Sequence, residues 1–444
     1  MNRNKIFDAI HYGIPSPSWQ GNVVIVGAGA AGLSAAHILR KSGANVQVLE
    51  ADPQYGGRIR SYTGFYNYPV ELGAEIVHGK RNIWYDLIKH QSKELLKYED
   101  YYDEYYQLDG QLVGEYEIEY DPDLLRAIDF MEEIEAYSGP ADMSVAEFIR
   151  KSGLNRRVHH LLEAWIGAEY GTSTHKISLQ SLVKASKQWA SGSGDFVFTR
   201  DAYISALEEI FADTLACVRV NTPVTRIDSQ NQSIRVIDDQ GNSWLADRVV
   251  VTVPLPILKS NFIHFIPAWP SEKLVAVQNL GMDVAIKIIM LFQHTFWEEE
   301  TGSIYGQGLI PEFYTSAKND TPILTAYITG DKAQTLSKMG TQAIDHAVNE
   351  LDQIFGYPKA SANFIKAQLM DWSQEPFIRG AYSFPSPQAL RYRRVLAEPL
   401  QNQIFFAGEA SNYHGHPATV QGAIETGYRA ACEVLGVESV TFSS

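Results

Sequence analysis

Three glycines and a glutamate near the start of the chain have the types and spacing of a site that binds a dinucleotide. Gly27, Gly29 and Gly32 follow an apolar run directly, and Glu50 ends a second apolar run a little over twenty residues later. In such a site the first glycine permits a tight turn, the second lets the backbone approach a pyrophosphate, and the third lets a helix pack on a strand. The helix N-terminus then faces the anion, and the acid accepts hydrogen bonds from ribose hydroxyls.

A strand, a helix and a second strand must position these residues, and the sequence predicts all of them between residues 22 and 49. The segment begins NVVIV, continues with a helical run and ends NVQVL. This context favours dinucleotide binding over a structural glycine turn, but the motif does not choose between NAD and FAD. Neighbouring small residues belong to the same predicted site, namely Ala28, Ala31 and Ala51.

The segment Gly56-Gly57-Arg58 follows the acid within one short loop. In this place it resembles the signature of the flavin-containing amine oxidase superfamily, which implies that Gly57 and Arg58 bind FAD, with the arginine along the diphosphate. An arginine matches a pyrophosphate in charge and in fork geometry. The alternative is a surface arginine after a turn.

Further segments, in the same order along the chain, extend the resemblance over nearly all of it. Residues 70–79 are similar to the family's loop beneath the flavin ring, and residue 224 falls where family members bind adenine through the backbone. Residues 405–423 are similar to the last FAD-binding segment, with an acid toward the ribitol and a helix N-terminus that stabilises negative charge on the reduced ring. The cofactor-binding residues implied in these segments are Leu72, Gly73, Ala74, Glu75, Val224, Gly408, Glu409, Thr419 and Val420.

Lys287 lies in the apolar run DVAIKIIMLF, where an amine is costly unless it has a partner. The resemblance implies that this lysine holds a water against flavin N5 and assists reoxidation by oxygen, whereas the alternative is a strand-end lysine that reaches solvent. Trp372 and Tyr382 resemble the aromatic residues that border the flavin and the amine path. Without the family, both would be interpreted as core aromatics.

Five residues bear on the substrate class and on how FAD is attached. His78 matches a histidine of the polyamine oxidases, with a satisfied structural histidine as the alternative. Glu169 aligns loosely with an acid that some polyamine oxidases use toward a distal ammonium. Ala381 and Thr419 replace the flavin-linking cysteine and the second cage tyrosine of the monoamine oxidases, so the resemblance implies non-covalent FAD. Ile76 stands where L-amino-acid oxidases have an arginine, which favours an amine without a carboxylate.

Composition limits the partners and the compartment. The chain has 444 residues, a net charge of −15 and two cysteines, Cys217 and Cys432, without metal-ligand spacing. This charge argues against a nucleic-acid surface, and no apolar run reaches the ~18 residues of a membrane span. We expect a cytoplasmic protein without a bound metal. The acidic, tyrosine-rich run 97–123 predicts a hairpin at Asp-Gly, either as a funnel for cationic amines or as a solvated sheet face.

The predicted fold is α/β, with a discontinuous, Rossmann-like FAD-binding domain and an α+β substrate-binding domain that carries an antiparallel sheet. We assign 1–79, 199–276 and 373–444 to the first domain, and 80–198 and 277–372 to the second. The predicted function is an FAD-dependent amine oxidase that acts on a polyamine or another amine, with O₂ as acceptor; its assembly stays open, a homodimer included. The alternatives are another oxidoreductase of this scaffold, such as an L-amino-acid oxidase, protoporphyrinogen oxidase or carotenoid desaturase, and a non-catalytic flavoprotein scaffold.

Overall fold

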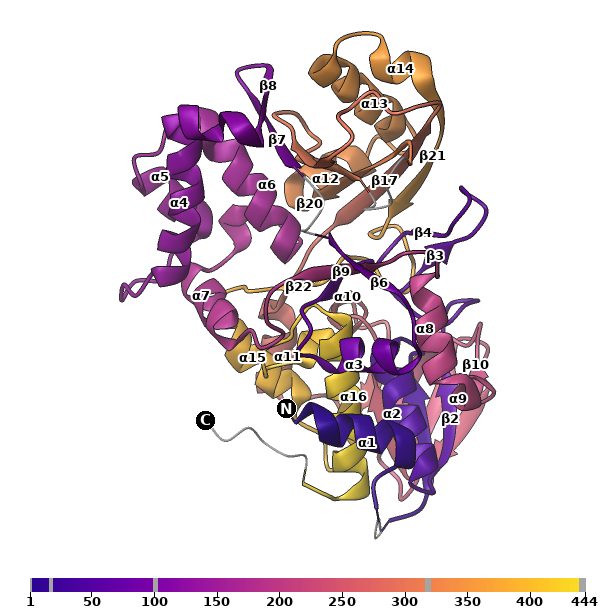
Figure 1. Cartoon of the computed structure of the whole chain (residues 1–444). Coiled ribbons are helices and arrows are strands. Elements are labelled where there is room, and N and C mark those ends of the chain that lie inside the picture. The colour runs from indigo at the N-terminus through magenta and orange to yellow at the C-terminus, as the bar shows by residue number, and fades with distance from the viewer. Residues whose placement is uncertain (1, 16–18, 99–102, 316–320, 439–444) are drawn as a thin grey trace.

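A parallel sheet forms the first layer of the structure. The computed structural model describes residues 2–15, 19–98, 103–315 and 321–438 (Figure 1). The central strand of the parallel sheet, β1 (Asn22–Val26), pairs in parallel with both β2 (Asn45–Leu49) and β14 (Arg248–Val251). The edges are β10 (Val218–Arg219) and β23 (Ile404–Phe406), so the sheet joins segments that lie far apart in the chain.

Both faces of this sheet are buried, as the continuous apolar run of β1 requires. Val23 and Ile25 pack in one core with α1 (Arg3–Tyr12), α2 (Ala30–Lys41) and α16 (Val420–Leu435). Val24 and Val26 point the other way, into a core shared with a second sheet. That sheet contains β11 (Val224–Asp228), β12 (Ile234–Asp238), β13 (Ser243–Ala246) and β15 (His264–Ile266), and its neighbours are α10 (Leu255–Lys259), α11 (Ser271–Asn279) and α15 (Ala389–Ala397).

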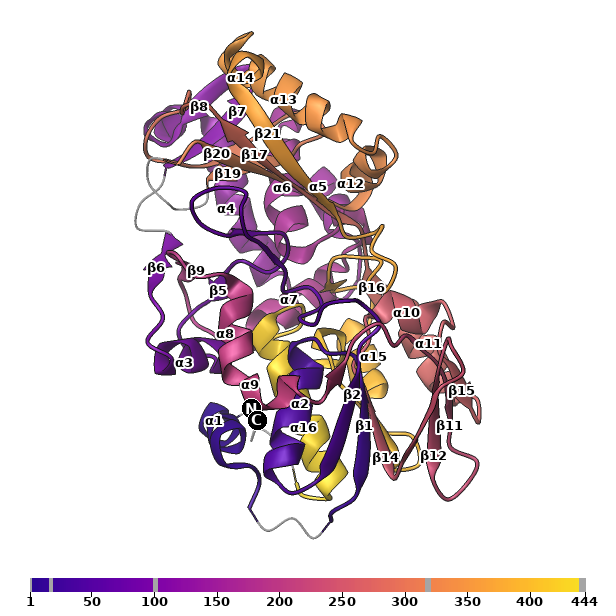
Figure 2. The ribbon, with the colours of Figure 1, turned by 90° about the vertical axis from the view of Figure 1, so that its right-hand side faces the viewer.

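A seven-stranded sheet lies beyond the parallel sheet, at the opposite end of the molecule (Figure 2). Its order is β21 (Phe364–Asp371), β17 (Ala285–Phe292), β20 (Ile323–Thr329), β19 (Glu312–Thr315), β18 (Thr301–Tyr305), β7 (Asp103–Leu108) and β8 (Gln111–Gly114). The predicted hairpin at Asp-Gly is the β7–β8 turn, whereas residues 99–102 of the same run lie outside the described residues. The sheet is antiparallel except for β18 and β7, which pair in parallel.

Helices cover the outer face of the seven-stranded sheet and one of its flanks. Ile286, Ile288 and Met290 of β17 pack in one core with α12 (Gly330–Ser337) and α13 (Gln342–Phe355), next to α14 (Lys359–Asn363). Their alternation leaves the odd-numbered position, Lys287, on the inner face. The flanking helices are α4 (Pro122–Ala136), α5 (Val145–Lys151), α6 (His159–Tyr170) and α7 (Leu179–Gln188).

Short elements connect the two large sheets. The short strands are β3 (Ser61–Tyr62), β4 (Val70–Glu71), β5 (Val77–His78), β6 (Leu95–Lys97), β9 (Asp195–Phe198), β16 (Gly281–Met282) and β22 (Ser383–Phe384). The remaining helical elements are α3 (Ile83–His90), α8 (Tyr203–Ile210), α9 (Ala212–Leu215) and the 3₁₀ turns η2 (Glu115–Tyr120), η3 (Arg156–Val158), η4 (Thr174–Lys176) and η5 (Glu409–Ser411).

The predicted fold class is confirmed: a discontinuous parallel sheet with flanking helices is joined to a largely antiparallel sheet. The proposed domain boundaries stay a prediction. Across the described residues, no helix combines the length and apolarity needed to cross a bilayer. The same residues contain no cluster of His, Cys, Asp or Glu side chains with the arrangement of a metal site.

Candidate active site

One cavity of about 1100 Å³ contacts both large sheets. We call its walls from the parallel sheet and the C-terminal loop the cofactor half. We call its walls from the seven-stranded sheet, α4, α6, α7, β9 and residues 75–78 the substrate half. The predicted cofactor residues that line the cavity are Gly27, Gly29, Ala31, Glu50, Ala51, Gly57, Arg58, Leu72, Gly73, Ala74, Glu75, Val224, Gly408, Glu409, Thr419 and Val420. The predicted catalytic residues His78, Glu169, Lys287, Trp372 and Tyr382 line it as well, whereas Ala28 and Gly32 do not.

The glycine motif forms a tight turn between β1 and α2. Gly27 has a φ of 105°, in the region that favours glycine. A Cβ on Gly32 would lie 2.0 Å from the carbonyl oxygen of Gly27, so only glycine lets α2 begin this close to the strand. No side chain caps the N-terminus of α2 at Gly29, and its first backbone N–H groups are suited to an anion. Gly32 therefore shapes the turn without contacting the cavity.

The carboxylate of Glu50 is held by the backbone on both oxygens. Oε2 accepts a hydrogen bond of 2.6 Å from the N–H of Ala28, and Oε1 accepts one of 2.9 Å from the N–H of Asp52. Burial raises the pKa of Glu50, although these backbone donors oppose the shift. Because each carboxylate oxygen has more than one acceptor site, Glu50 can also accept from hydroxyl groups of a ligand in the cavity. Ala28 acts through its backbone, by orienting this acid.

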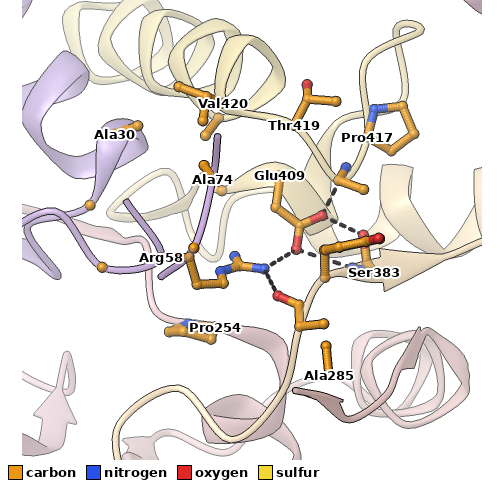
Figure 3. A pocket seen from close by; sticks show the side chains of 18 of the residues that line it. Ala30, Arg58, Ala74, Pro254, Ala285, Ser383, Glu409, Pro417, Thr419 and Val420 are labelled. Atoms are coloured by element: carbon orange, nitrogen blue, oxygen red, sulfur yellow. Dashed lines mark hydrogen bonds and ion pairs between the residues drawn. The ribbon is translucent and has the colours of Figure 1, made fainter. Parts of the chain in front are cut away.

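Arg58 and Glu409 join the two ends of the chain in the cofactor half (Figure 3). Nη1 of Arg58 lies 2.9 Å from Oε1 of Glu409 and donates to the carbonyl of Ala381 at 2.7 Å. Glu409 also accepts from the hydroxyl of Ser383 and, at 2.9 Å, from the N–H of Ala418. Burial opposes ionisation of Glu409, but Arg58 and Arg393 outweigh it and hold its pKa below the usual range. The pair is therefore a charged, hydrogen-bonded junction between the two segments.

The C-terminal loop ends in a capped helix that faces the same half of the cavity. The hydroxyl of Thr419 accepts a hydrogen bond of 3.0 Å from the N–H of Gly422 and donates to the carbonyl of His416 at 2.9 Å. Thr419 is thus the N-cap of α16, and Val420 is its first residue. Both lie beside Pro417 at the cavity (Figure 3), where the positive end of the helix dipole stabilises negative charge.

A row of directly opposed residues crosses the inner face of the seven-stranded sheet. Lys287 of β17 pairs with Tyr327 of β20, Tyr327 with Glu312 of β19, and Glu312 with Tyr305 of β18. All of them line the cavity. Since neighbouring strands lie ~4.8 Å apart, Glu312 stands roughly 10 Å across the sheet from Lys287.

Lys287 does not reach bulk solvent, because its side chain is only 6% exposed. Its Nζ donates to the carbonyl of Glu71 at 2.9 Å, to the carbonyl of Gly73 at 3.2 Å and to Oε2 of Glu75 at 2.8 Å. The strand-end alternative is therefore wrong. The partners of the amine come from residues 71–75. The family resemblance predicts that this segment lies beneath the flavin ring.

Comparison with known families shows which family the chain belongs to. A family model described as flavin containing amine oxidoreductase matches residues 30–435, most of the chain. The chain belongs to this family. As a flavin containing amine oxidoreductase it has FAD as its cofactor, and the glycine turn, Glu50 and the Arg58–Glu409 junction are the groups suited to hold it.

Relatives of the chain include histone demethylases and polyamine oxidases. It is 29% identical over 459 residues to mouse lysine-specific histone demethylase 1B, covering 95% of this chain and 54% of that protein. It is 27% identical over 467 residues to rice (Oryza sativa subsp. japonica) polyamine oxidase 4, covering 93% of this chain and 88% of that protein. The chain therefore spans about half the length of the demethylase.

Solved structures of amine oxidases share the fold. A putrescine oxidase bound to putrescine superposes with a TM-score of 0.79 at 21% identity, covering 94% of this chain and 99% of that one. Cyclohexylamine oxidase from Brevibacterium oxydans superposes with a TM-score of 0.78 at 20% identity and the same coverage. At such identities the likeness concerns the fold alone.

The residues around the cavity fit FAD that is bound non-covalently. Ala381 lines the cavity and has no sulfur to attach to a flavin. Neither cysteine is among the lining residues, since Cys432 is buried within α16 and Cys217 precedes β10. The cofactor is therefore held by hydrogen bonds, charge and packing.

The substrate half of the cavity is acidic. Burial raises the pKa of Glu169, and burial together with Glu104 raises the pKa of Glu312 to about 7, although Ser303 hydrogen-bonds it. Within the described lining of this half, the basic side chains are Lys184, His78 and Lys287, the last of which is paired with Glu75. The carboxylates that line this half are Glu75, Glu104, Glu135, Glu169, Asp195 and Glu312.

The predicted aromatic and histidine side chains are held by specific contacts. Nε1 of Trp372 donates to the carbonyl of Leu72 at 3.0 Å, which fixes the ring against the predicted flavin loop. The hydroxyl of Tyr382 lies 2.9 Å from that of Tyr327. Nδ1 of His78 lies 2.9 Å from Oδ1 of Asp195, across the β5–β9 pair.

Several lining residues were missed by the sequence interpretation. Glu312 and Tyr327 occupy inward positions of strands in which their neighbours are apolar, as in EFYT and ILTAYIT, and this alternation is the signal that could have found them. Glu104 belongs to the acidic run 97–123, and it lines the cavity, whereas Asp109 lies outside with a 68% exposed side chain, paired with Arg157. That run therefore contributes both to the cavity and to the outer surface.

Proposed function

We propose that the chain is an FAD-dependent amine oxidase whose substrate carries more than one cationic nitrogen, as polyamines do. The observation that supports this substrate class is the set of carboxylates in the substrate half, defined above. A cavity lined by more carboxylates than basic side chains favours a cationic ligand over a neutral or anionic one. The family membership and the polyamine oxidases among its relatives agree with it.

In the proposed reaction, a neutral amine loses two electrons and two protons at one C–N bond and becomes an imine, which water hydrolyses to a carbonyl compound and a smaller amine. Bound FAD would supply the two-electron chemistry of this reaction, accepting a hydride from the α-carbon and passing the electrons to O₂ to give H₂O₂. The chain contributes binding and orientation, and it needs no strong base.

Specific side chains carry these contributions. Glu312 and Glu169 bind ammonium groups that do not react, and so place the reacting carbon. Trp372 and Tyr382, both held by the hydrogen bonds described above, exclude water and face a cationic amine with their rings. Asp195 orients the ring of His78, whose other nitrogen, Nε2, we assign to a substrate nitrogen.

An L-amino acid fits this half less well, because its carboxylate would meet acids. Ile76 lines the cavity at the position where an arginine was expected for such substrates. The buried Arg393 does line the cavity, but it donates to the hydroxyl of Ser383 at 2.7 Å and belongs to the cofactor half. O₂ as acceptor, a cytoplasmic location and a homodimer stay predictions.

An anaerobic stopped-flow screen of the purified yellow protein tests the proposal. The panel contains spermidine, spermine, their acetylated forms, putrescine, alkyl and aryl monoamines, L-amino acids and a methylated lysine peptide. Fast bleaching of the flavin by the di- and polyamines is the expected result. Bleaching by amino acids alone would contradict the assigned substrate half, and no bleaching by any amine would favour the desaturase-like or scaffold alternatives.

A further inference from the structure

The amine of Lys287 has as many acceptors within the protein as it has N–H groups. An ammonium has three donors and no acceptor. The carbonyls of Glu71 and Gly73 and the carboxylate of Glu75 lie 2.9, 3.2 and 2.8 Å from Nζ. An N–H can be offered to a water or to oxygen in the cavity only if one of these hydrogen bonds is given up.

Glu75 is the acceptor that can be changed without altering the backbone. It is the only one of the three that acts through its side chain, and it neutralises the charge of Lys287 as an ion pair. The same Oε2 accepts a hydrogen bond of 2.8 Å from the hydroxyl of Tyr314. Burial and the Glu75 charge raise the pKa of Tyr314, which keeps its hydroxyl protonated as a donor. Glu75 therefore links residues 71–75 to both β17 and β19.

We propose that Glu75 is a positioning residue that keeps the N–H groups of the Lys287 ammonium engaged within the protein and thereby limits the reactivity of the reduced protein with O₂. The inference rests on the proposed function for its oxidase context. Oxygen gains negative charge as it accepts electrons, and an ammonium N–H aimed at it would stabilise that charge. With its charge neutralised and its donors engaged, Lys287 supplies little of this stabilisation.

The electrostatic consequence extends to the cofactor itself. Both Lys287 and Glu75 line the cavity, as do Ala74 and Gly73, so removal of the carboxylate leaves the cation there without its ion-pair partner. A cation favours the electron-rich, reduced form of a nearby redox group. The midpoint potential of the flavin is thus a readout of the ion pair that does not depend on turnover.

The test uses the holoprotein reduced by light or dithionite, so that no amine is needed. Mixing with oxygenated buffer gives the rate constant of reoxidation for wild type, Glu75→Ala, Lys287→Met and the double variant. We expect Glu75→Ala to react about tenfold faster, Lys287→Met to differ from wild type by less than about threefold, and the double variant to lose the gain. Tyr314→Phe, which leaves Lys287 paired, is the matched control and stays near wild type.

The midpoint potential, measured by dye equilibration, should shift positive in Glu75→Ala and return when Lys287→Met is added. If Glu75→Ala does not fold, Glu75→Gln removes the charge, keeps an acceptor oxygen, and shows the same positive shift with a smaller gain in rate. A tenfold slower Lys287→Met in the presence of Glu75, or an unchanged potential on loss of the carboxylate, would overturn the inference. Because no amine is used, these outcomes are independent of a failed substrate screen.

Discussion

Replacing Glu312 by glutamine should impair the use of polyamines much more than the use of monoamines. The carboxylate stands two strands from Lys287 in the row across the sheet, and Oε1 accepts a hydrogen bond of 2.9 Å from the hydroxyl of Ser303. Glutamine keeps the size and an acceptor oxygen but removes the charge. A substrate whose second nitrogen reaches this point loses an ion pair, whereas a monoamine has no group to place there.

The size of the effect follows from simple electrostatics. A carboxylate and an ammonium ~4 Å apart interact by about 4 kcal/mol at an effective dielectric constant near 20. The amide oxygen of glutamine can still accept a hydrogen bond, and solvent repays part of the lost attraction, which leaves a net cost of about 2 kcal/mol. This corresponds to a roughly 30-fold decrease in kcat/KM for the polyamine.

The assay compares kcat/KM for spermidine and for an alkylmonoamine of similar length, in wild type and in Glu312→Gln. Because burial raises the pKa of Glu312 to about 7, its charge appears as the pH rises through that value. The ratio of kcat/KM for the polyamine to that for the monoamine should therefore increase through pH 7 in wild type and increase less in the variant, where Glu169 remains. An equal loss for both substrates, or a ratio that keeps its full pH dependence in the variant, would refute the reasoning.

Two further predictions concern carboxylates whose charge state the fold controls. Glu409→Gln leaves Arg58 without its counter-ion 2.9 Å away. We expect the free energy of unfolding, measured by denaturant titration, to fall by about 3 kcal/mol. We also expect weaker binding of FAD, measured by the fluorescence of released flavin. Glu147→Gln, at the exposed pair with Lys151, is the control and should leave both measurements unchanged. For Glu71, burial raises the pKa from 4.5 to about 7. The protonated form of Glu71 therefore stabilises the folded protein below pH ~4.5. This contribution to the free energy of unfolding, up to about 3 kcal/mol, is lost as the pH rises through 7. The free energy of unfolding should fall from pH 5 to pH 8 more steeply in wild type than in Glu71→Gln, and parallel curves would show that Glu71 ionises normally.

The cofactor half was predictable because its signals are local in the sequence. Strand β1, the glycine turn and α2 follow one another directly, so apolar periodicity and three glycines are enough to place them. The Arg58 and Glu409 segments were found by their resemblance to a family. Their direct contact was not, since the two residues are 351 positions apart.

The substrate half was less predictable because strand register decides it. Lys287 was found as a charge within an apolar strand, but its partner Glu75 was assigned to the cofactor alone. Glu312 and Tyr327 became neighbours of Lys287 only when β19 and β20 paired beside β17 in one register. A shift of one residue would turn each of these side chains to the opposite face, and local sequence does not encode that choice.

The sequence by itself therefore determined the family, the cofactor, the order of strands and helices around the glycine turn and a part of the side chains that line the cavity. The tertiary structure decided which of them touch: Glu75 lies 212 residues from Lys287 in the chain and 2.8 Å from it in space. Hydrophobic periodicity is a property of neighbouring residues, whereas an ion pair in a cavity depends on the packing of two sheets, which only the folded chain brings together.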